Sequence, residues 1–267
     1  MQTYFFLVAA LSYAVCAVLP AKQDKLIAGL TGVAWLSHAV TLWLDLMAPG
    51  TLRFGFSAML SAALWVSVGA YWIENRNFSL DGLRRMLMPC AVVAIGLAWA
   101  FPGNQVILEG KSAVFGWHIT VAVLAYSTLT IAAFHAVLMA LQESRLHTRS
   151  ESRGFLASAL DQLPALLTME KLLFRMIGLG FVLLSLTVLS GIVFSEKLLG
   201  KVLTWDHKSV FTMLSWLLFA VLLAGRHWRG WRGKTALTFT LAGFATLLLG
   251  YVGSRFVLEV VLHRGFA

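Results

Sequence analysis

Charged side chains and cysteines are both scarce in this chain. Only 12% of the 267 residues are Asp, Glu, Lys or Arg, whereas 59% are hydrophobic, and the mean hydropathy is +0.80. A soluble domain of ordinary composition carries about 25% charged residues. The two cysteines, Cys16 and Cys90, lie in separate apolar runs without a CxxC motif, which excludes a dithiol redox centre of that type. We expect both to be small buried residues of helices.

The excess of positive charge does not indicate nucleic-acid binding. Lys and Arg outnumber Asp and Glu by 21 to 12, but they lie in short segments between apolar runs and form no continuous basic face. This distribution is typical of a polytopic membrane protein. We therefore expect contacts with membrane lipid and none with nucleic acid.

Apolar runs long enough to cross a bilayer as a helix recur along the chain. The predicted spans are Thr3–Leu19, Leu26–Leu44, Phe56–Ile73, Met86–Phe101, Trp117–Leu141, Leu172–Phe194, Ser209–Gly225 and Ala236–Leu262. The predicted fold is all-α, a membrane bundle of about eight transmembrane helices, with residues 1–267 as a single integral membrane domain. No basic segment or small-residue cleavage site marks a signal peptide, so we expect the first run to be retained as a span.

Positive charge also predicts the orientation of the chain. Most Lys and Arg residues follow the first, third, fifth and seventh spans, which places those loops in the cytoplasm and both termini outside. The protein is then a multi-pass protein of the cytoplasmic (inner) membrane of a bacterium, with a long cytoplasmic loop at 142–171 and an outer loop at 195–208. The segment GFLASALDQLPALLTME in the cytoplasmic loop predicts a short helix on the membrane surface.

Four of the 7 histidines are predicted to lie near the outer membrane face. His38 lies in the outer half of the second span, His118 opens the fifth, His207 lies in the outer loop and His263 ends the eighth. His135 lies roughly 25 Å deeper than His118 in a continuous helix, and we expect a structural role there. An ionisable group inside a membrane is a functional hypothesis by default, although a hydrogen bond between helices would also explain His38.

These histidines suit some cofactors better than others. Zinc takes three or four ligands at recognisable spacings, and the sequence has neither HExxH nor a paired His/Cys cluster. Haem needs one or two axial ligands, an apolar slot and cations for its propionates, and histidines at one membrane face meet that need. Trp35, His38, Leu42 and Asp45 fall on one helical stripe, which suits a flat aromatic ligand and equally suits ordinary helix packing.

Three stretches resemble the cytochrome c assembly family of haem-handling membrane proteins, the CcmC/CcsA type. The run LLFRMIGLGFVLLSLTVLSG leads into the outer loop as in the family, and GWRGKTALTFTLAGF is similar to its closing hairpin and last helix. The outer loop keeps part of the family signature W-G-x-x-W-x-W-D-x-K, namely Gly200, Trp205, Asp206 and Lys208. Leucines replace two of its tryptophans, and the chain most resembles the HemX-like and YpjD-like branch.

The resemblance implies a haem b at the outer membrane face. His118, eight residues before Tyr126, matches the H-x7-Y pattern of the family, and His263 falls near its second outer histidine. His38 has no family position. We take His118 as the first candidate for an axial ligand of the haem iron, and His38 or His263 as the second.

Four further residues complete the predicted site. Trp205 would stack on or edge the porphyrin. Asp206 would organise the loop through hydrogen bonds to backbone amides or to Lys208. Lys208 and Arg255 would pair with the propionates, although lipid phosphates are an equally good partner for both cations.

We therefore expect a haem-binding protein that supports cytochrome c assembly or relays haem at the outer face. It would act with other cytochrome c assembly or haem-pathway membrane proteins and not as an enzyme. Two other classes stay open. One is a proton-coupled small-solute transporter that uses His38 and Asp45. The other is a cofactor-free interaction subunit, which the two missing tryptophans favour. Haem absorbance would separate the haem-binding protein from both of these classes.

Overall fold

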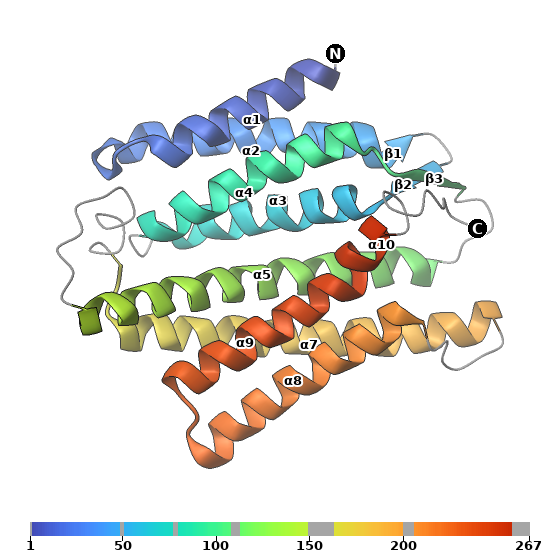
Figure 1. Ribbon diagram of the computed structural model, residues 1–267. Coiled ribbons are helices and arrows are strands. Elements are labelled where there is room, and N and C mark those ends of the chain that lie inside the picture. The colour runs from blue at the N-terminus through green and yellow to red at the C-terminus, as the bar shows by residue number, and fades with distance from the viewer. Residues whose placement is uncertain are drawn as a thin grey trace. The chain divides into compact units, whose positions relative to one another are not determined.

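The computed structural model describes residues 2–48, 51–76, 80–107, 113–148, 163–199 and 206–257. They form two compact units, one made of Met1–Ile107 with Leu138–Met169 and the other of Leu108–Val137 with Glu170–Ala267. Most of these residues are helical (Figure 1). The prediction of one integral membrane domain over residues 1–267 stays a prediction.

Four long helices build most of the first unit (Figure 1). They are α1 (Gln2–Val18), α2 (Asp24–Leu46), α3 (Phe56–Glu74) and α4 (Asp81–Ala100), with a 3-10 turn, η1 (Ala21–Gln23), between the first two. Helix α1 packs on α2 and α4, and α3 packs on α4 and α2. The buried face of α3 is rich in Ala and Ser. Such small residues let helices approach closely, and this close packing stabilises helix pairs in lipid, where water provides no hydrophobic driving force between them.

The second unit takes its helices from the rest of the chain. They are the first part of α5 (Ala113–Thr148), most of α7 (Leu166–Leu199), α8 (His207–Arg229) and α9 (Gly233–Leu248), followed by a π-helical turn, η2 (Leu249–Gly253), and α10 (Ser254–Phe256). Close contacts at glycine hold these helices together. A Cβ on Gly180 would lie 2.6 Å from Leu129, and one on Gly243 would lie 2.9 Å from Phe219. Gly230 ends α8 in the left-handed conformation, with φ of 65°.

Seven helices of the described part of the chain are long and apolar enough to cross a membrane. They span Ala21–Leu44, Phe56–Glu74, Asp81–Ala100, Gly116–Arg145, Leu166–Val193, His207–Arg229 and Gly233–Gly253, and Thr3–Val18 is a shorter apolar helix. The predicted all-α bundle of about eight transmembrane helices is confirmed, and the chain is a multi-pass membrane protein. The placement of both termini outside stays a prediction.

A small antiparallel sheet in the first unit was not predicted. Strand β2 (Thr51–Phe54) lies between β1 (Met47–Ala48) and β3 (Asn104–Ile107). Arg53 is in register with Gln105, and Leu52 lies opposite Met47 on one side and Val106 on the other. The sheet therefore joins the segment after α2 to the segment after α4, at one end of the first unit.

Helices extend into both of the predicted loops. Helix α7 continues to Leu199 and α8 begins at His207, so both edges of the predicted outer loop 195–208 are helical. Likewise α5 runs to Thr148 and α7 starts at Leu166, inside the predicted cytoplasmic loop 142–171. Polar residues continue these helices beyond the apolar stretch from which a span is predicted. Most of the predicted surface helix lies outside the described residues.

The two cysteines differ in burial. Cys16 is buried, as expected, but Cys90 is exposed on α4, so the prediction that both are buried is wrong for Cys90. A thiol behaves as a small hydrophobe, and an exposed position on a membrane helix satisfies that preference as well as a protein core does.

Candidate functional site

His118 lies in the first turns of α5, where it faces α7 in the second unit. Its Nδ1 is 2.9 Å from the Ser190 hydroxyl oxygen, and a Cβ placed on Gly191 would lie 3.3 Å from its Cε1. The glycine therefore provides the space into which the imidazole packs. Its neighbour Trp117 is 70% exposed, so His118 is the inward-facing member of this aromatic pair.

The hydrogen bonds around Ser190 determine which nitrogen of His118 carries the proton. The Ser190 hydroxyl donates to the Thr187 carbonyl at 3.1 Å. A serine has one hydroxyl proton, so toward His118 the oxygen acts as the acceptor and Nδ1–H donates. The lone pair of the neutral ring is then on Nε2. Histidines that bind metals are commonly anchored in this way, by a hydrogen bond from the other ring nitrogen.

A group of aromatic residues lies two turns along α5 from His118. The Tyr126 hydroxyl donates to the Leu247 carbonyl at 2.8 Å, and its ring meets Tyr251 of η2 edge-on at 6.3 Å. The Lys208 ammonium lies 5.9 Å from the centre of the Tyr251 ring. The start of α8 and the π-helical turn therefore meet beside α5, and Lys208 makes a cation–π contact there.

Asp206 caps α8. Its side chain accepts a hydrogen bond from the Ser209 backbone N–H at 2.8 Å, which is the expected bond from Asp206 to a backbone amide. An N-cap carboxylate also interacts favourably with the helix dipole. The cap fixes the direction in which the chain enters α8.

Three predicted site residues cannot be placed in this geometry. Trp205 and His263 lie outside the described residues, and so does the side chain of Arg255. Of the predicted set, the structure brings Asp206 and Lys208 together at the start of α8 and places His118 on α5 of the same unit.

His38 belongs to the first unit, where it is fully buried. Its Nε2 is 2.8 Å from the Ser61 hydroxyl, and its Nδ1 is 3.4 Å from the Tyr13 hydroxyl. The Thr41 hydroxyl donates to the His38 carbonyl. The imidazole thus links α1, α2 and α3, and ligation of a metal would require the loss of one of its two ring hydrogen bonds.

The stripe of Trp35, His38, Leu42 and Asp45 is used, where its side chains are described, for helix packing. Trp35 stacks on Trp65 of α3 with 4.6 Å between ring centres. Trp35 and His38 therefore each have a partner on α3, and Leu42 of the same stripe is buried. This favours helix packing as the role of the stripe over the alternative in which it holds a flat ligand.

His135 is fully buried in α5, where its Nδ1 donates to the Ile131 carbonyl at 2.9 Å. Within the described residues its Nε2 has no hydrogen-bond partner. The ring is thus fixed by its own helix, in agreement with a structural role. Among the described residues no group of three or more His, Cys, Asp or Glu side chains could hold a metal ion.

The sequence did not point to Ser190, Thr187 or Tyr251 as neighbours of the predicted site. Serine and threonine residues are common on membrane helices. Ser190 differs from the others because α7 packs against α5 in a way that brings its hydroxyl to His118. The second unit thus provides one histidine, His118, that is anchored through Nδ1. The rings of Tyr126 and Tyr251 and the cation of Lys208 lie at the same end of this unit. These residues fit an axial ligand and its surroundings, as haem requires.

Comparison with known proteins gives a consistent result. The Inner membrane protein YpjD of Escherichia coli (strain K12) is 29% identical over 172 residues, which cover 64% of this chain and 62% of that protein. A Cytochrome c biogenesis protein CcsA of Prochlorococcus marinus is 26% identical over 238 residues, covering 79% and 75%. The CcsA protein of Chlamydomonas reinhardtii is 29% identical over 212 residues, covering 76% and 57%.

The chain spans less than two thirds of the length of the YpjD relative. No solved structure matches it. The family described as cytochrome C assembly protein matches residues 6–262. Because that match covers nearly all of the sequence, this chain belongs to the cytochrome c assembly protein family.

Proposed function

We propose that this protein binds haem b at the outer face of the bacterial inner membrane and supports cytochrome c assembly there, with His118 as an axial ligand. The observation that carries the proposal is the anchored imidazole of His118, whose Nδ1–H donates to Ser190 and whose lone pair is on Nε2. Membership of the cytochrome c assembly family supports it. The name of the YpjD relative, an inner membrane protein, supports the location.

The residues around His118 would each act in a definite way. Ser190 orients the imidazole, and Gly191 leaves room for it. Asp206 fixes the start of α8 and thereby the position of Lys208, whose charge would balance a propionate. Bound haem would supply an iron that accepts the Nε2 lone pair. The function proposed is binding and transfer, not catalysis.

His263 is the proposed second ligand because it falls near the second outer histidine of the family in the sequence. His38 is the alternative, although both of its ring nitrogens already have hydroxyl partners. Trp205 and Arg255 keep their proposed roles beside the porphyrin and a propionate. In the proposed orientation both termini and the His118 end of α5 face outward.

The experiment is an absorbance spectrum of the detergent-purified protein, oxidised and reduced, with quantified haem. We expect a Soret band that is lost in His118→Ala and in His263→Ala. His135→Ala is the control at depth in the same helix, and His227→Ala is the control for an exposed position. Both controls should keep the band.

Two results would contradict the proposal. A protein that stays colourless after haem is added would favour the transporter or the cofactor-free subunit. A Soret band that survives His118→Ala but disappears in His38→Ala would move the ligand to the first unit.

A further inference from the structure

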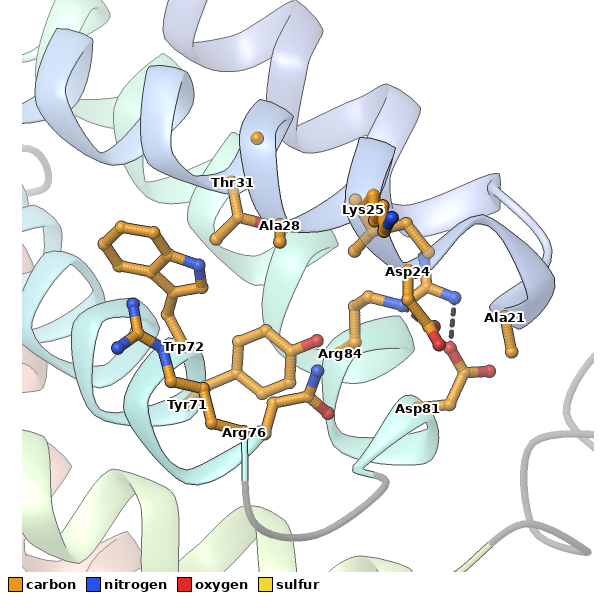
Figure 2. A pocket seen from close by; sticks show the side chains of 13 residues that line it. Ala21, Asp24, Lys25, Ala28, Thr31, Tyr71, Trp72, Arg76, Asp81 and Arg84 are labelled. Carbon is orange, nitrogen blue, oxygen red and sulfur yellow. Dashed lines mark hydrogen bonds and ion pairs between the residues drawn. The ribbon is translucent and has the colours of Figure 1, made fainter.

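A cavity in the first unit is not used by the proposed function. It has a volume of about 650 Å³, and its walls come from the beginning of α2, the end of α3 and the beginning of α4 (Figure 2). The sheet adjoins the opposite ends of these three helices. The cavity therefore lies at the other end of the unit from the sheet, where a membrane helix emerges from the hydrocarbon core.

The wall of the cavity changes in polarity along the helices. Near the helix ends it is formed by Asp24, Lys25, Asn75, Arg76 and Asp81, and further along α2 by Ile27, Ala28, Gly29 and Thr31. Asp24 and Thr31 are separated by roughly 10 Å along α2. The cavity therefore has charged side chains near the helix ends, a buried charged pair in Asp81 and Arg84, and an apolar flank along α2 at Ile27, Ala28 and Gly29. A charged opening beside an apolar flank matches an amphiphile, because its charged group and its apolar body then each contact side chains of similar polarity.

Two cations lie at the mouth. The Arg76 guanidinium lies 5.5 Å from the centre of the Trp72 ring, and Figure 2 shows the two side chains together on the α3 side of the cavity. Lys25 extends from α2. Both cations are exposed, and within the described residues no carboxylate pairs with either of them. A cation–π contact holds the guanidinium in place without using its N–H groups.

Arg84 has a different role, because its donors are used inside the protein. It is 1% exposed and donates to the carbonyls of Cys16 and Leu19 and to the Asp81 carboxylate. Figure 2 shows this pair on the α4 side. The buried arginine therefore fixes the wall, and with it the lining holds three cations against the two carboxylates Asp24 and Asp81.

We propose that this cavity binds the phosphodiester headgroup of an anionic phospholipid, with Arg76 and Lys25 as the partners of the phosphate. Basic pockets between membrane helices are suited to such headgroups. Trp72 would flank the glycerol region, and the apolar wall of α2 would meet the first part of the acyl chains. A soluble phosphate ester shares the phosphate chemistry but leaves the apolar wall without a contact. Neither haem nor His118 takes part.

The test is the thermal stability of the full-length protein in detergent, measured with three additives. Phosphatidylglycerol is expected to raise Tm by about 3 °C or more, since a ligand that binds only the folded state stabilises it. Phosphatidylcholine and glycerol 3-phosphate are expected to leave Tm unchanged. The lipid that copurifies with the protein, quantified by mass spectrometry, should be enriched in phosphatidylglycerol.

Substitutions with matched controls link this effect to the cavity. Gly29→Leu should abolish the shift, because a Cβ at Gly29 meets nothing within 4 Å and the side chain can fill the space. Gly96→Leu is the control, since Gly96 is equally open but does not line the cavity. Arg76→Gln should remove most of the shift, and Lys234→Gln, an exposed cation elsewhere, should not. Asp24→Asn should increase it, because a repulsive carboxylate is lost.

Two outcomes would overturn the proposal. One is an equal shift with phosphatidylcholine, and the other is a phosphatidylglycerol shift that persists in both Gly29→Leu and Arg76→Gln. A shift with glycerol 3-phosphate alone that disappears in these variants would retain the phosphate site but reject the lipid as its source.

Discussion

Trp35 and Trp65 form a reciprocal pair between α2 and α3. The indole N–H of each donates to the backbone carbonyl of the other, both at 3.0 Å, and the rings stack at an angle of 12°. Inside a bilayer there is no water to satisfy an indole N–H. The pair therefore satisfies two donors and joins two helices in one arrangement.

Gly69→Ala should break this pair. A Cβ at Gly69 would lie 2.9 Å from Nε1 of Trp35, so the indole must move and lose its hydrogen bond to Trp65. We expect a loss of ~1–3 kcal/mol in the free energy of unfolding, together with a change in near-UV circular dichroism from the tryptophans.

Gly96→Ala is the matched control for that change, because nothing lies within 4 Å of a Cβ there. Alanine is the better helix former, so this variant should keep the wild-type stability or gain up to ~1 kcal/mol. Equal losses in the two variants would mean that the space above Gly69 is not the cause.

Ser190→Ala should weaken haem binding without unfolding the protein. The substitution removes one of the acceptors at the His118 ring, to which the Thr187 carbonyl also bonds, and loss of such an anchor costs about 10- to 100-fold in metal affinity. Haem titration followed by Soret absorbance measures it. Ser185→Ala, on the same helix but bonded to Trp216, should retain the wild-type affinity. An unchanged affinity in Ser190→Ala would show that the serine does not orient the ligand.

Arg84→Lys should destabilise the first unit although the charge is kept. The guanidinium reaches the Leu19 carbonyl at 2.8 Å and also the Cys16 carbonyl and Asp81. A compact ammonium cannot span these acceptors. We expect a loss of ~2–4 kcal/mol, measured by thermal or denaturant unfolding. Arg229→Lys, at an exposed position, should change stability by less than ~0.5 kcal/mol.

Glu170→Gln should destabilise the second unit, because one carboxylate oxygen accepts from two arginines. Its Oε1 is 2.7 Å from Arg226 and 2.9 Å from Arg232. We expect a loss of ~1–3 kcal/mol, with a weaker dependence of Tm on salt concentration. Arg232→Gln should cost less than ~1 kcal/mol, since that side chain is 56% exposed and its ion pair is screened. The reverse order of the two losses would contradict this account.

The helices could be predicted because a helix that crosses the bilayer requires a run of about 20 apolar residues, which is visible in the sequence. The sequence predicts a span over Phe56–Ile73, and α3 is Phe56–Glu74. The sheet could not be predicted, because β1 and β3 are two and four residues long and depend on pairing across half the unit. From the sequence, Arg84 is counted with the Lys and Arg residues of the loops that set the orientation of the chain. Its buried role depends on the carbonyls at the end of α1, which such a count does not reveal.

The candidate site could be predicted only in part. His118 and Asp206 follow from local patterns, and Asp206 does cap a helix. Ser190 is 72 residues from His118, and Trp35 is 30 residues from Trp65. Helical spacing along one span gives no information on such partners. It placed Trp35 beside His38 as a stripe but could not show that the two side chains face different neighbours.

Helix α7 continues beyond its apolar run. Its apolar run ends at Phe194, but the helix continues through Ser195, Glu196 and Lys197 to Leu199, which at 1.5 Å per residue adds roughly 7.5 Å of helix. The helix therefore carries the chain beyond its apolar run before the sequence reaches Gly200. For the haem transfer proposed above, this extension would separate the point of release from the hydrocarbon, and deleting one helical turn of it would reduce that separation by roughly 5 Å.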